Sequence, residues 1–364
     1  MSEASTLFRN ASKTSIFWIT VALAALVVFF GVASPAGTFL TSFNAQTIAA
    51  DASVLLILAT ATTIVIISGG LDLSIGSVMT FAAVIGLIVM RDVGDSWSAV
   101  AVGTVVAIAC GAGWGLINGL LISLAKIPPF VVTLGSLGAA LGAARLITGG
   151  LTQSGVPSVL SADIGNAEVI GIPVPFLIGI AVACVAAAIM AYTRFGEHVY
   201  LLGSNEEGAR RGGIGTRSLQ VRIYVISGAL ASLAGVVELA RFGTASVATG
   251  HLTELLAALA AVIIGGAALT GGSGLVLASV VGVFIPVVIN NGLVIMGVQP
   301  FWQEIVVGAI LVAAVGLDQV RRAGVFQRAA TPSPEEEAPP DSARGPAVHP
   351  NTVTPDSSAT KEKA

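Results

Sequence analysis

The sequence predicts an all-α, polytopic membrane protein with about ten transmembrane helices. Of its 364 residues, 55% are hydrophobic and only 10% are charged, whereas a soluble domain has roughly 25% charged residues. Many separate apolar runs approach the roughly 20 residues that a helix needs to cross a bilayer. A transmembrane β-barrel would show short alternating segments of about ten residues instead, and the sequence lacks them.

Residues 1–15 are polar and form a predicted cytoplasmic amino-terminal segment. Arg9 and Lys13 favour this side, because basic residues concentrate on the cytoplasmic face of membrane proteins. The apolar run that follows could be read as a secretory signal. We expect it to be retained, because it is long, lacks a clear small-x-small cleavage pattern and precedes many further apolar runs.

The predicted transmembrane permease domain covers residues 16–320. Its expected spans are 16–33, 48–68, 75–90, 98–117, 129–148, 173–192, 221–240, 254–271, 274–296 and 302–318. With both termini in the cytoplasm, the basic loops 118–128 and 194–220 fall inside, and the loop 149–172, which has no Lys or Arg, falls outside. Arg91 lies in an outer loop and is a mild exception, next to the acid Asp92.

Residues 331–364 form a predicted disordered, acidic and Pro/Ser-rich cytoplasmic tail. This tail has almost no large apolar residue to support a core. It also accounts for the formal net charge of −3. Cys110 and Cys184 both lie inside apolar runs, where we expect small buried side chains rather than a disulfide or metal ligands.

The stretch 194–222 is the most polar part of the interior of the sequence. It holds five arginines against three glutamates and therefore belongs on the cytoplasmic side. Its centre predicts a short helix. Asn205 is a suitable N-cap, acids in the first turn and arginines in the last turn complement the helix dipole, and Gly212 with the next glycine ends the helix.

The motif GGLDLSIGS at 69–77 predicts a broken helix beside a pathway, because Asp72 is a carboxylate with apolar spans on both sides. The alternative is that Asp72 or Ser74 caps the helix that starts near residue 75. Further polar residues in apolar runs could line a route for a neutral polar solute or form interhelical hydrogen bonds. The translocation-pathway candidates are Asp72, Ser74, Asn118, Thr133, Glu254, Asn290 and Asn291.

No set of catalytic residues emerges from the sequence. The three histidines lie in different regions, and no metal-binding motif or Ser-His-Asp pattern is present. The glycine-rich stretch 271–276 lacks the Lys-Ser/Thr of a phosphate-binding loop. We therefore expect no enzyme activity, no cofactor, no metal and no nucleic-acid partner. ATP-driven transport would need an ATPase on another polypeptide.

Two internal echoes favour a transporter, since transporters are often built from duplicated halves. The first pairs 67–77 with 264–273, and the second pairs Asn118-Gly119-Leu120 with Asn291-Gly292-Leu293. Their spacing differs between the halves by about one helix. Glycine-rich convergence is the alternative explanation.

Six stretches, in order, carry a resemblance to known proteins: ISGGLDLSIGS (67–77), IPPFVVTLGSL (127–137), LGSNEEGARRGGI (202–214), ISGALASLAGVVELAR (226–241), ELLAALAAVIIGGAALTGGSG (254–274) and NNGLVIMGV (290–298). Together they are similar to the ribose/xylose-type sugar ABC importer permeases, over about residues 45–320. The resemblance implies a multi-pass subunit in the bacterial plasma membrane that imports a monosaccharide or polyol. Its partners would be a cytoplasmic ABC ATPase, an extracytoplasmic sugar-binding protein and a second permease subunit, in a homodimer.

By the same resemblance, the stretch 202–214 is similar to the coupling segment, a short cytoplasmic helix that docks on the ATPase. The residues carried over are Gly203, Asn205, Glu206, Glu207, Ala209, Arg210, Arg211 and Gly212. Gly208 and Gly212 stand where the family has Ala or Ser, and Glu238 is unusual in an apolar segment. The rival hypothesis is an ion-coupled secondary transporter of a small polar solute, with Asp72 or Glu254 as its ion site.

Overall fold

The computed structural model describes residues 15–35, 37–248 and 252–299, together with 301–316 apart from 303, 307, 311, 314 and 315. The described residues belong to one compact unit. Residues 1–14 of the predicted amino-terminal segment and the predicted disordered tail 331–364 lie outside the described residues.

Eight helices within the described residues are long and apolar enough to cross a membrane. They are α2 (Ser15–Ala33), α3 (Ser42–Ile67), α4 (Ile75–Val93), α5 (Trp97–Ser123), α6 (Pro129–Thr148), α8 (Val174–Tyr192), α11 (Thr216–Phe242) and α13 (Val276–Ile295). The apolar helix α12 (Leu252–Ile264) is shorter, and helical residues also occur between 301 and 316. The prediction of an all-α polytopic membrane protein is confirmed. The count of ten and the orientation in the membrane stay predictions.

The predicted span 254–271 is wrong in its second half. Its helix ends at Ile264, and residues 265–275 form a loop before α13. Gly266, Gly271 and Gly272 in this loop have φ angles of 86°, 84° and 74°. An α-helix cannot continue through this left-handed conformation, which glycine adopts readily. The predicted span ran through the break because the loop also contains apolar residues, Ala267, Ala268 and Leu269, between its glycines.

Several helices are longer than the apolar runs that predicted them. The helix α3 begins at Ser42 rather than at residue 48, because the Thr41 side chain caps it and accepts a 3.1 Å hydrogen bond from the Asn44 backbone N–H. The helix α5 extends to Ser123 rather than ending at 117, and α11 covers 216–242 rather than 221–240. Polar ends of long helices carry little hydropathy signal.

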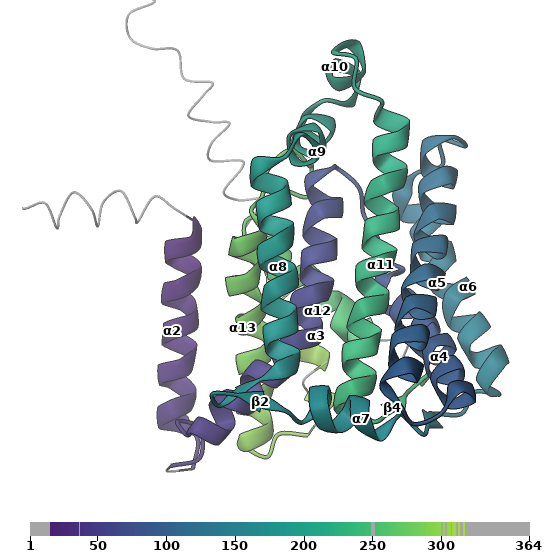
Figure 1. The fold of residues 1–364 in the computed structure, drawn as a ribbon. Coiled ribbons are helices and arrows are strands. Elements are labelled where there is room, and N and C mark those ends of the chain that lie inside the picture. Colours follow the sequence, from purple (N-terminus) through teal and green to yellow (C-terminus); the bar gives the residue numbers. More distant parts are fainter. Residues whose placement is uncertain are drawn as a thin grey trace, which may run out of the picture. The chain divides into compact units, whose positions relative to one another are not determined.

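Short elements lie at the two ends of the helical bundle (Figure 1). One end holds α9 (Arg194–Ser204) and α10 (Glu206–Arg211), and we call it the α10 end. The opposite end holds α7 (Ser158–Leu160), the π-helix η1 (Ser161–Gly165) and two small antiparallel sheets. In these sheets β1 (Gln153–Ser154) pairs with β4 (Thr244–Ala245), and β2 (Glu168–Val169) pairs with β3 (Ile172–Pro173).

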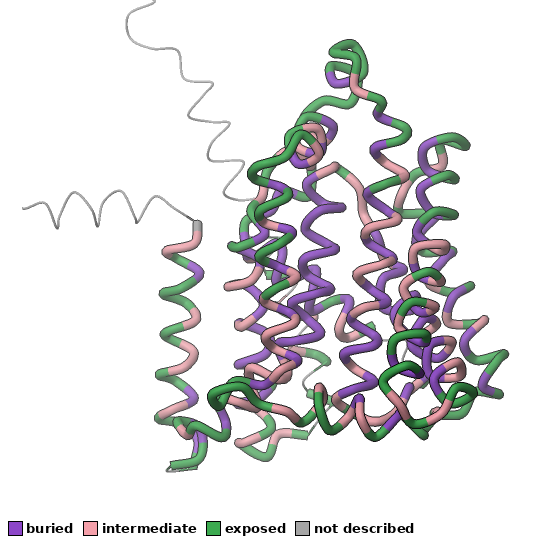
Figure 2. Tube along the Cα trace, in the orientation of Figure 1, coloured by how far each residue is buried: buried purple, intermediate pink, exposed green. Residues whose placement is uncertain are grey.

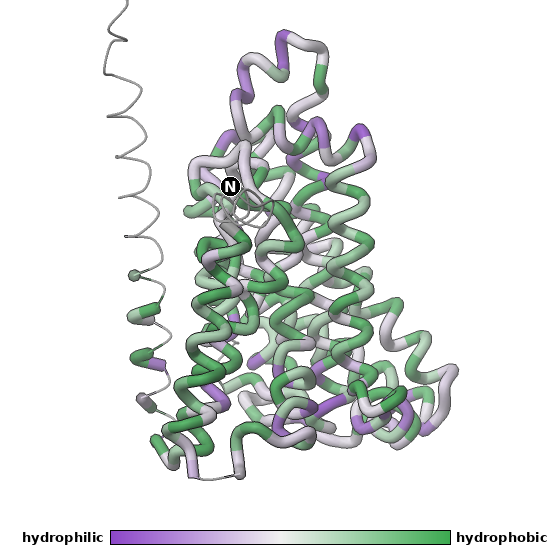
Figure 3. Tube along the Cα trace, turned by 90° about the vertical axis from the view of Figure 1, so that its left-hand side faces the viewer, coloured by the Kyte–Doolittle hydropathy of each residue, from purple (hydrophilic) through white to green (hydrophobic). Residues whose placement is uncertain are grey.

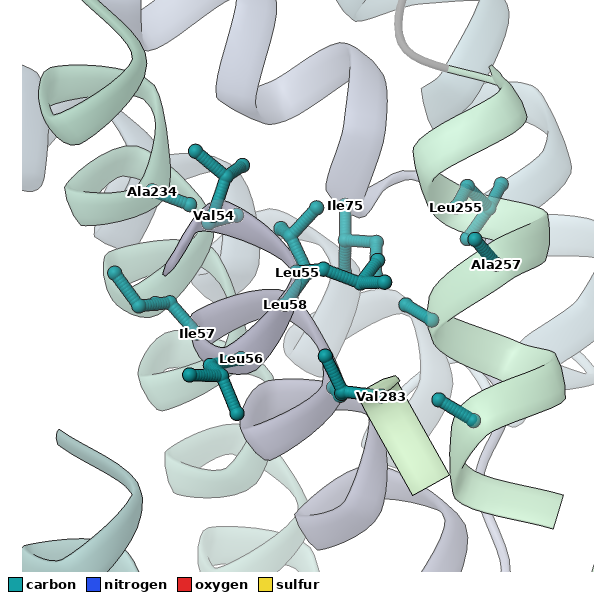
Figure 4. Packing of buried hydrophobic residues seen from close by; sticks show 14 of the residues in the cluster. Val54, Leu55, Leu56, Ile57, Leu58, Ile75, Ala234, Leu255, Ala257 and Val283 are labelled. Carbon is teal, nitrogen blue, oxygen red and sulfur yellow. The ribbon is translucent and has the colours of Figure 1, made fainter. Parts of the chain in front are cut away.

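The helix α3 lies at the centre of the packing and is the most buried of the spans. Figure 2 shows its nearly continuous buried surface, in contrast to the exposed outer faces of α2 and α8. Figure 4 shows how Leu55 and Leu58 of α3 lie near Ile75 of α4, Leu255 of α12 and Val283 of α13. Hydrophobic residues also cover the length of the helices, whereas hydrophilic ones gather at the ends (Figure 3), as expected of a bilayer-spanning bundle.

Glycines allow α5 and α11 to pack backbone against backbone. A Cβ atom on Gly111 of α5 would lie 2.3 Å from the Gly228 carbonyl oxygen, and one on Gly228 of α11 would lie 2.0 Å from the Gly111 carbonyl oxygen. Any side chain at either position would push the two helices apart. Small residues are the usual means of close helix packing within a membrane, and they hold α11 in place for the polar network described below.

Candidate functional site

The segment between α8 and α11 contains the predicted short helix, and α10 is the element furthest from the bundle in Figure 1. The side chain of Asn205 accepts a 2.8 Å hydrogen bond from the Gly208 backbone N–H, which confirms the predicted N-cap. Two glutamates lie in the first turn and two arginines in the last. Gly212 follows as the C-cap, and Gly213 has a φ angle of 84°, so the helix ends where predicted.

Glu207 holds both arginines of α10. Its carboxylate forms an ion pair with Arg210 and a second one, of 3.1 Å, with Arg211. All three side chains are exposed, as is Glu206, whereas Ala209 is buried. Exposed ion pairs contribute only about 0–1 kcal/mol to stability. Their main effect is to orient two guanidinium groups on the outer surface of α10.

Gly203, at the end of α9, lies in a junction of three backbone segments. A Cβ atom there would lie 1.9 Å from the Ile67 carbonyl oxygen at the end of α3, and 2.5 Å from the backbone nitrogen of Gly272 in the α12–α13 loop. Those two segments are joined directly, since the Gly272 N–H donates a 2.8 Å hydrogen bond to the Ile67 carbonyl. The base of the α10 segment is thus packed on the two loops that form the first sequence echo.

Tyr200 adds a side-chain link to this junction. Its hydroxyl donates a 2.8 Å hydrogen bond to the carbonyl of Gly274 in the α12–α13 loop. Burial raises the pKa of the Tyr200 hydroxyl above its ordinary value, so this group, already protonated at neutral pH, loses its proton less readily still. The helix α9 is therefore fixed to the loop by a backbone contact at Gly203 and by this hydrogen bond.

Four of the pathway candidates are buried and lie close together, on the side of this junction that faces the middle of the bundle. They are Asp72, Ser74, Asn118 and Thr133. The Asp72 carboxylate accepts hydrogen bonds from the Ser74 backbone N–H at 2.9 Å and from the Ser74 hydroxyl at 2.6 Å. The Ser74 hydroxyl in turn accepts a 3.0 Å bond from the Asn118 amide, and the Ser136 hydroxyl donates to Asn118. This buried polar network links the α3–α4 loop to α5 and α6.

The network reaches α11 as well. The hydroxyl of Ser227 donates a 2.8 Å hydrogen bond to the second carboxylate oxygen of Asp72. The Leu71 carbonyl accepts hydrogen bonds from Thr133 at 3.2 Å and from Tyr224 at 3.4 Å. The short polar loop after α3 is therefore bonded to three surrounding helices.

The alternative interpretation, a cap of α4 by Asp72 or Ser74, holds for the position of Ser74 but not for a side-chain hydrogen bond. Ser74 occupies the N-cap position, but its side chain makes no capping hydrogen bond. Asp72 lies two residues earlier, and its carboxylate accepts from Ser74 and Ser227 rather than from the first turn of α4. The carboxylate is oriented by the backbone N–H and hydroxyl of Ser74 in the same loop and by the Ser227 hydroxyl of α11, and these donors satisfy it in the interior of the bundle.

Two other candidates, Glu254 and Asn290, line a separate cavity of about 250 Å³ near the opposite end. The cavity lies among α3, α4, α11, α12 and α13, and its remaining polar lining comes from Asp51, Glu238, Arg241 and Thr253. Arg241 forms an ion pair with Asp51 that joins α11 to α3. The sequence placed these charged residues in apolar runs and allowed Glu238 to pair with Arg241 on one helix, but it did not indicate that Arg241 meets Asp51 of α3.

The last candidate, Asn291, belongs to neither group. Although it follows Asn290 on α13, it is buried and donates a 2.9 Å hydrogen bond to the Asn44 side chain near the start of α3. The two asparagines of the second echo therefore lie at opposite ends of the bundle. Asn118 lies toward the α10 end of α5, whereas Asn291 lies toward the opposite end of α13. Two helices, α4 and α5, lead from the first echo to Asn118, but only α13 leads from its counterpart to Asn291. The chain therefore runs in opposite directions at the two asparagines, and a single duplication does not relate both echoes.

A second cavity, of about 790 Å³, lies at the α10 end. Its lining includes Glu206 and Arg210 of α10, Lys126 of the α5–α6 loop and Tyr224 of α11. Tyr224 also contacts the buried polar network through Leu71. The predicted coupling residues thus form part of the wall of a polar cavity whose inner end reaches that network.

Sequence reasoning missed Ser227, Tyr224 and Thr253. Nothing in a single apolar helix distinguishes Ser227 from Ser232, since both are serines in the same run and only their neighbours in space differ. Asp51 and Arg241 could have been predicted to pair, because each is a charged residue in a predicted membrane span and such residues need a partner of opposite charge.

Comparison with known proteins places the chain among membrane transporters. The sequence profile of the family described as "Branched-chain amino acid transport system / permease component" matches residues 44–315. No solved structure matches the chain. The matched region contains the α10 segment, the buried polar network and all the residues that line both cavities.

Curated relatives match over nearly their whole length. The chain is 35% identical to the D-allose transport system permease protein of Escherichia coli K12, over 82% of this chain and 90% of the relative. It is 32% identical to the ribose import permease protein of the same strain, over 83% and 93%. It is also 32% identical to that strain's galactose/methyl galactoside import permease protein, over 85% and 94%.

Proposed function

The chain belongs to the branched-chain amino acid transport system/permease component family, within its sugar ABC importer permeases, and we propose that it is the permease subunit of an importer for a monosaccharide or related polyol. It is a multi-pass inner-membrane transport subunit and not an enzyme. Hydrolysis of ATP belongs to a separate ATPase. The observation that carries the proposal is the similarity to three sugar permeases over more than four-fifths of this chain.

Membership of this family implies an ATPase and a binding-protein partner. We assign the ATPase to the α10 end, which makes that end cytoplasmic, and the sugar-binding protein to the opposite end. A second copy of the chain completes the transporter as a homodimer in the lipid bilayer. The basic residues of α10 support the assignment of sides, because cytoplasmic segments are rich in Lys and Arg.

The helix α10 is the proposed docking element for the ATPase. It is capped, exposed and furthest from the bundle, and its arginines are held in place by Glu207. Its base at Gly203 is packed on the loops after α3 and α12. A displacement of α10 by the ATPase would therefore reach the loop that carries Asp72 through rigid backbone contacts.

Transport would proceed by alternating access between the two cavities. The smaller cavity contains Glu254 and Asn290 near the opposite end, and the larger one lies at the α10 end. Between them lie buried apolar residues such as Leu58 and Ile75. A polar solute cannot cross this packed layer without a rearrangement, and the ATPase would supply the energy for it.

Reconstituted uptake tests the proposal. The chain is placed in proteoliposomes with its cognate ATPase and binding protein, and uptake of labelled D-ribose, D-allose and D-galactose is measured with and without ATP. Uptake of at least one sugar that requires both ATP and the ATPase is expected. Uptake that continues without the ATPase and is abolished by an uncoupler would instead indicate the ion-coupled secondary transporter.

A further inference from the structure

The cavity of about 250 Å³ near the opposite end has an unusual lining for a membrane interior. Its walls contain three carboxylates, from Asp51, Glu238 and Glu254, and the single guanidinium of Arg241. The lining thus has a formal charge of −2. Charged residues inside a membrane protein are costly and mark substrate pathways by default.

The ion pair between Arg241 and Asp51 gives this lining a fixed geometry. The Arg241 side chain is 16% exposed and that of Asp51 is 39% exposed, so the carboxylate is the more accessible partner. The guanidinium also lies over the ring of Phe242, 4.9 Å from the ring centroid. A carboxylate, a guanidinium and an aromatic ring therefore meet at one corner of the cavity.

Two of the helices that line the cavity, α13 and α12, depart from a regular full-length span. Pro286 lies inside α13 and removes one backbone donor from that helix. The short helix α12 begins at Leu252, so Glu254 lies in its first turn at the cavity wall. Interrupted and short helices are the best indicator of a binding site in transporters, because irregular backbone at depth needs a cavity or protein around it.

From these observations we propose that this cavity is a solute site for an uncharged cyclic polyol, in which the Asp51–Arg241 pair and Asn290 bind ring hydroxyls. The inference rests on the proposed sugar import. Carboxylates accept hydrogen bonds from hydroxyls, the guanidinium and amide donate them, and the Phe242 ring packs against the apolar face of the solute. The excess of carboxylates over cations in the lining favours an uncharged solute over sugar acids and sugar phosphates at this step.

Thiol labelling tests the charge of the site without the need for transport. Asn290→Cys is made in a chain that also carries Cys110→Ser and Cys184→Ser, and membrane vesicles are treated with a cationic or an anionic methanethiosulfonate reagent of similar size. The cationic reagent should react at least tenfold faster, because a charged cleft raises the local concentration of the opposite charge. Leu40→Cys is the control, since residue 40 is exposed and residues 37–46 carry no charged side chain. Equal rates at Asn290→Cys would overturn the proposal.

A matched pair of neighbours tests the hydroxyl contacts. Asn290→Ala should raise the half-saturating concentration for whichever of D-ribose, D-allose and D-galactose the wild type imports by about tenfold, the equivalent of about 1.4 kcal/mol. Asn291→Ala should leave that concentration unchanged, since Asn291 is bonded to Asn44 outside the cavity. Equal effects of the two substitutions, or none from Asn290→Ala, would reject the site. In either case ATP-driven uptake by the wild type would leave the proposed function intact.

Discussion

Asp72 and Ser227 are joined by a 2.8 Å hydrogen bond from the serine hydroxyl to the carboxylate, across 155 residues of sequence. This bond connects the loop after α3 to the middle of α11. Both side chains are almost completely buried. Because an interior carboxylate without donors would be costly, the position of this loop depends on side chains from other helices.

Ser227→Ala should lower the stability of the protein, because it removes one interhelical donor to Asp72. Such bonds contribute about 0.6 kcal/mol on average and up to about 1.7 kcal/mol in membrane proteins. Ser232→Ala is the matched control, since the Ser232 hydroxyl bonds only to the Gly228 carbonyl of its own helix among the described residues. The midpoint of thermal unfolding in detergent should fall more for Ser227→Ala. The same midpoint for both variants would contradict the prediction.

Asp72→Asn should reduce transport. The carboxylate accepts two hydrogen bonds from Ser74 and one from Ser227, whereas an amide offers a single acceptor oxygen and two donors. The loop that links α3 to α4 would then lose contacts on one side. Initial uptake rates in proteoliposomes, normalised to the amount of inserted protein, measure the effect. Normal uptake would mean that the hydrogen bonds of Asp72 do not guide the transport cycle.

Replacement of Glu206, Arg210 and Arg211 by alanine should weaken binding of the ATPase while leaving membrane insertion intact. All three side chains are exposed on α10, so their loss leaves the packing of the bundle unchanged. Pull-down of the ATPase by the tagged permease measures the association. Alanine at Arg194, a basic residue at the start of α9 outside α10, is the control for a general loss of charge. Undiminished recovery of the ATPase with the triple variant would show that the docking assignment is wrong.

The loop at the opposite end should become looser at acidic pH. Asp95 accepts hydrogen bonds from the Ser158 hydroxyl at 2.6 Å and from its backbone N–H at 2.7 Å. The hydroxyl bond is the main reason why the pKa of Asp95 lies below its ordinary value. A lowered pKa means that this stabilisation is complete above the ordinary value and is lost as the pH falls through the lowered one.

Hydrogen exchange of the Ser158 amide, corrected for its intrinsic pH dependence, measures this effect. Protection in the wild type should be present at about pH 7 and should be lost at acidic pH as the pH falls through the lowered pKa of Asp95. Asp95→Ala should abolish it already at about pH 7, and Asp92→Ala at the end of α4 serves as the control. Protection that persists in Asp95→Ala would show that the carboxylate does not anchor this loop.

The sequence predicted best what depends on local chemistry. The capped helix α10 was predicted to within a residue or two, because Asn205, the charges and Gly212 all act within a single turn or two. The predicted span 254–271 ran past the end of α12 at Ile264, although Gly265 and Gly266 follow that residue directly in the sequence. Composition therefore predicts the spans, whereas the end of α12 depends on the conformation of the glycines that follow it.

The candidate site could be predicted only in part. Asp72, Ser74, Asn118 and Thr133 were recognised as polar residues in apolar runs, and the structure brings them together. Asn290 and Asn291 look alike in the sequence, yet one lines the cavity and the other is bonded to Asn44. The difference is a rotation of about 100° between successive residues of a helix, and only the packing of α13 decides which residue faces the cavity.

Gly203→Ala should uncouple the α10 segment from the rest of the permease. The new Cβ atom would lie 1.9 Å from the Ile67 carbonyl oxygen and 2.5 Å from the Gly272 nitrogen, and both are backbone atoms that cannot rotate away. The 2.8 Å hydrogen bond between them would have to open. Since α10 would remain capped by Asn205, the ATPase should still bind, but its hydrolysis of ATP should drive little uptake.

The ratio of sugar imported to ATP hydrolysed in proteoliposomes measures this loss. Gly113→Ala is the control, because a Cβ atom at Gly113 meets nothing within 4 Å. An unchanged ratio in Gly203→Ala would show that the junction is not the route by which α10 moves the two loops.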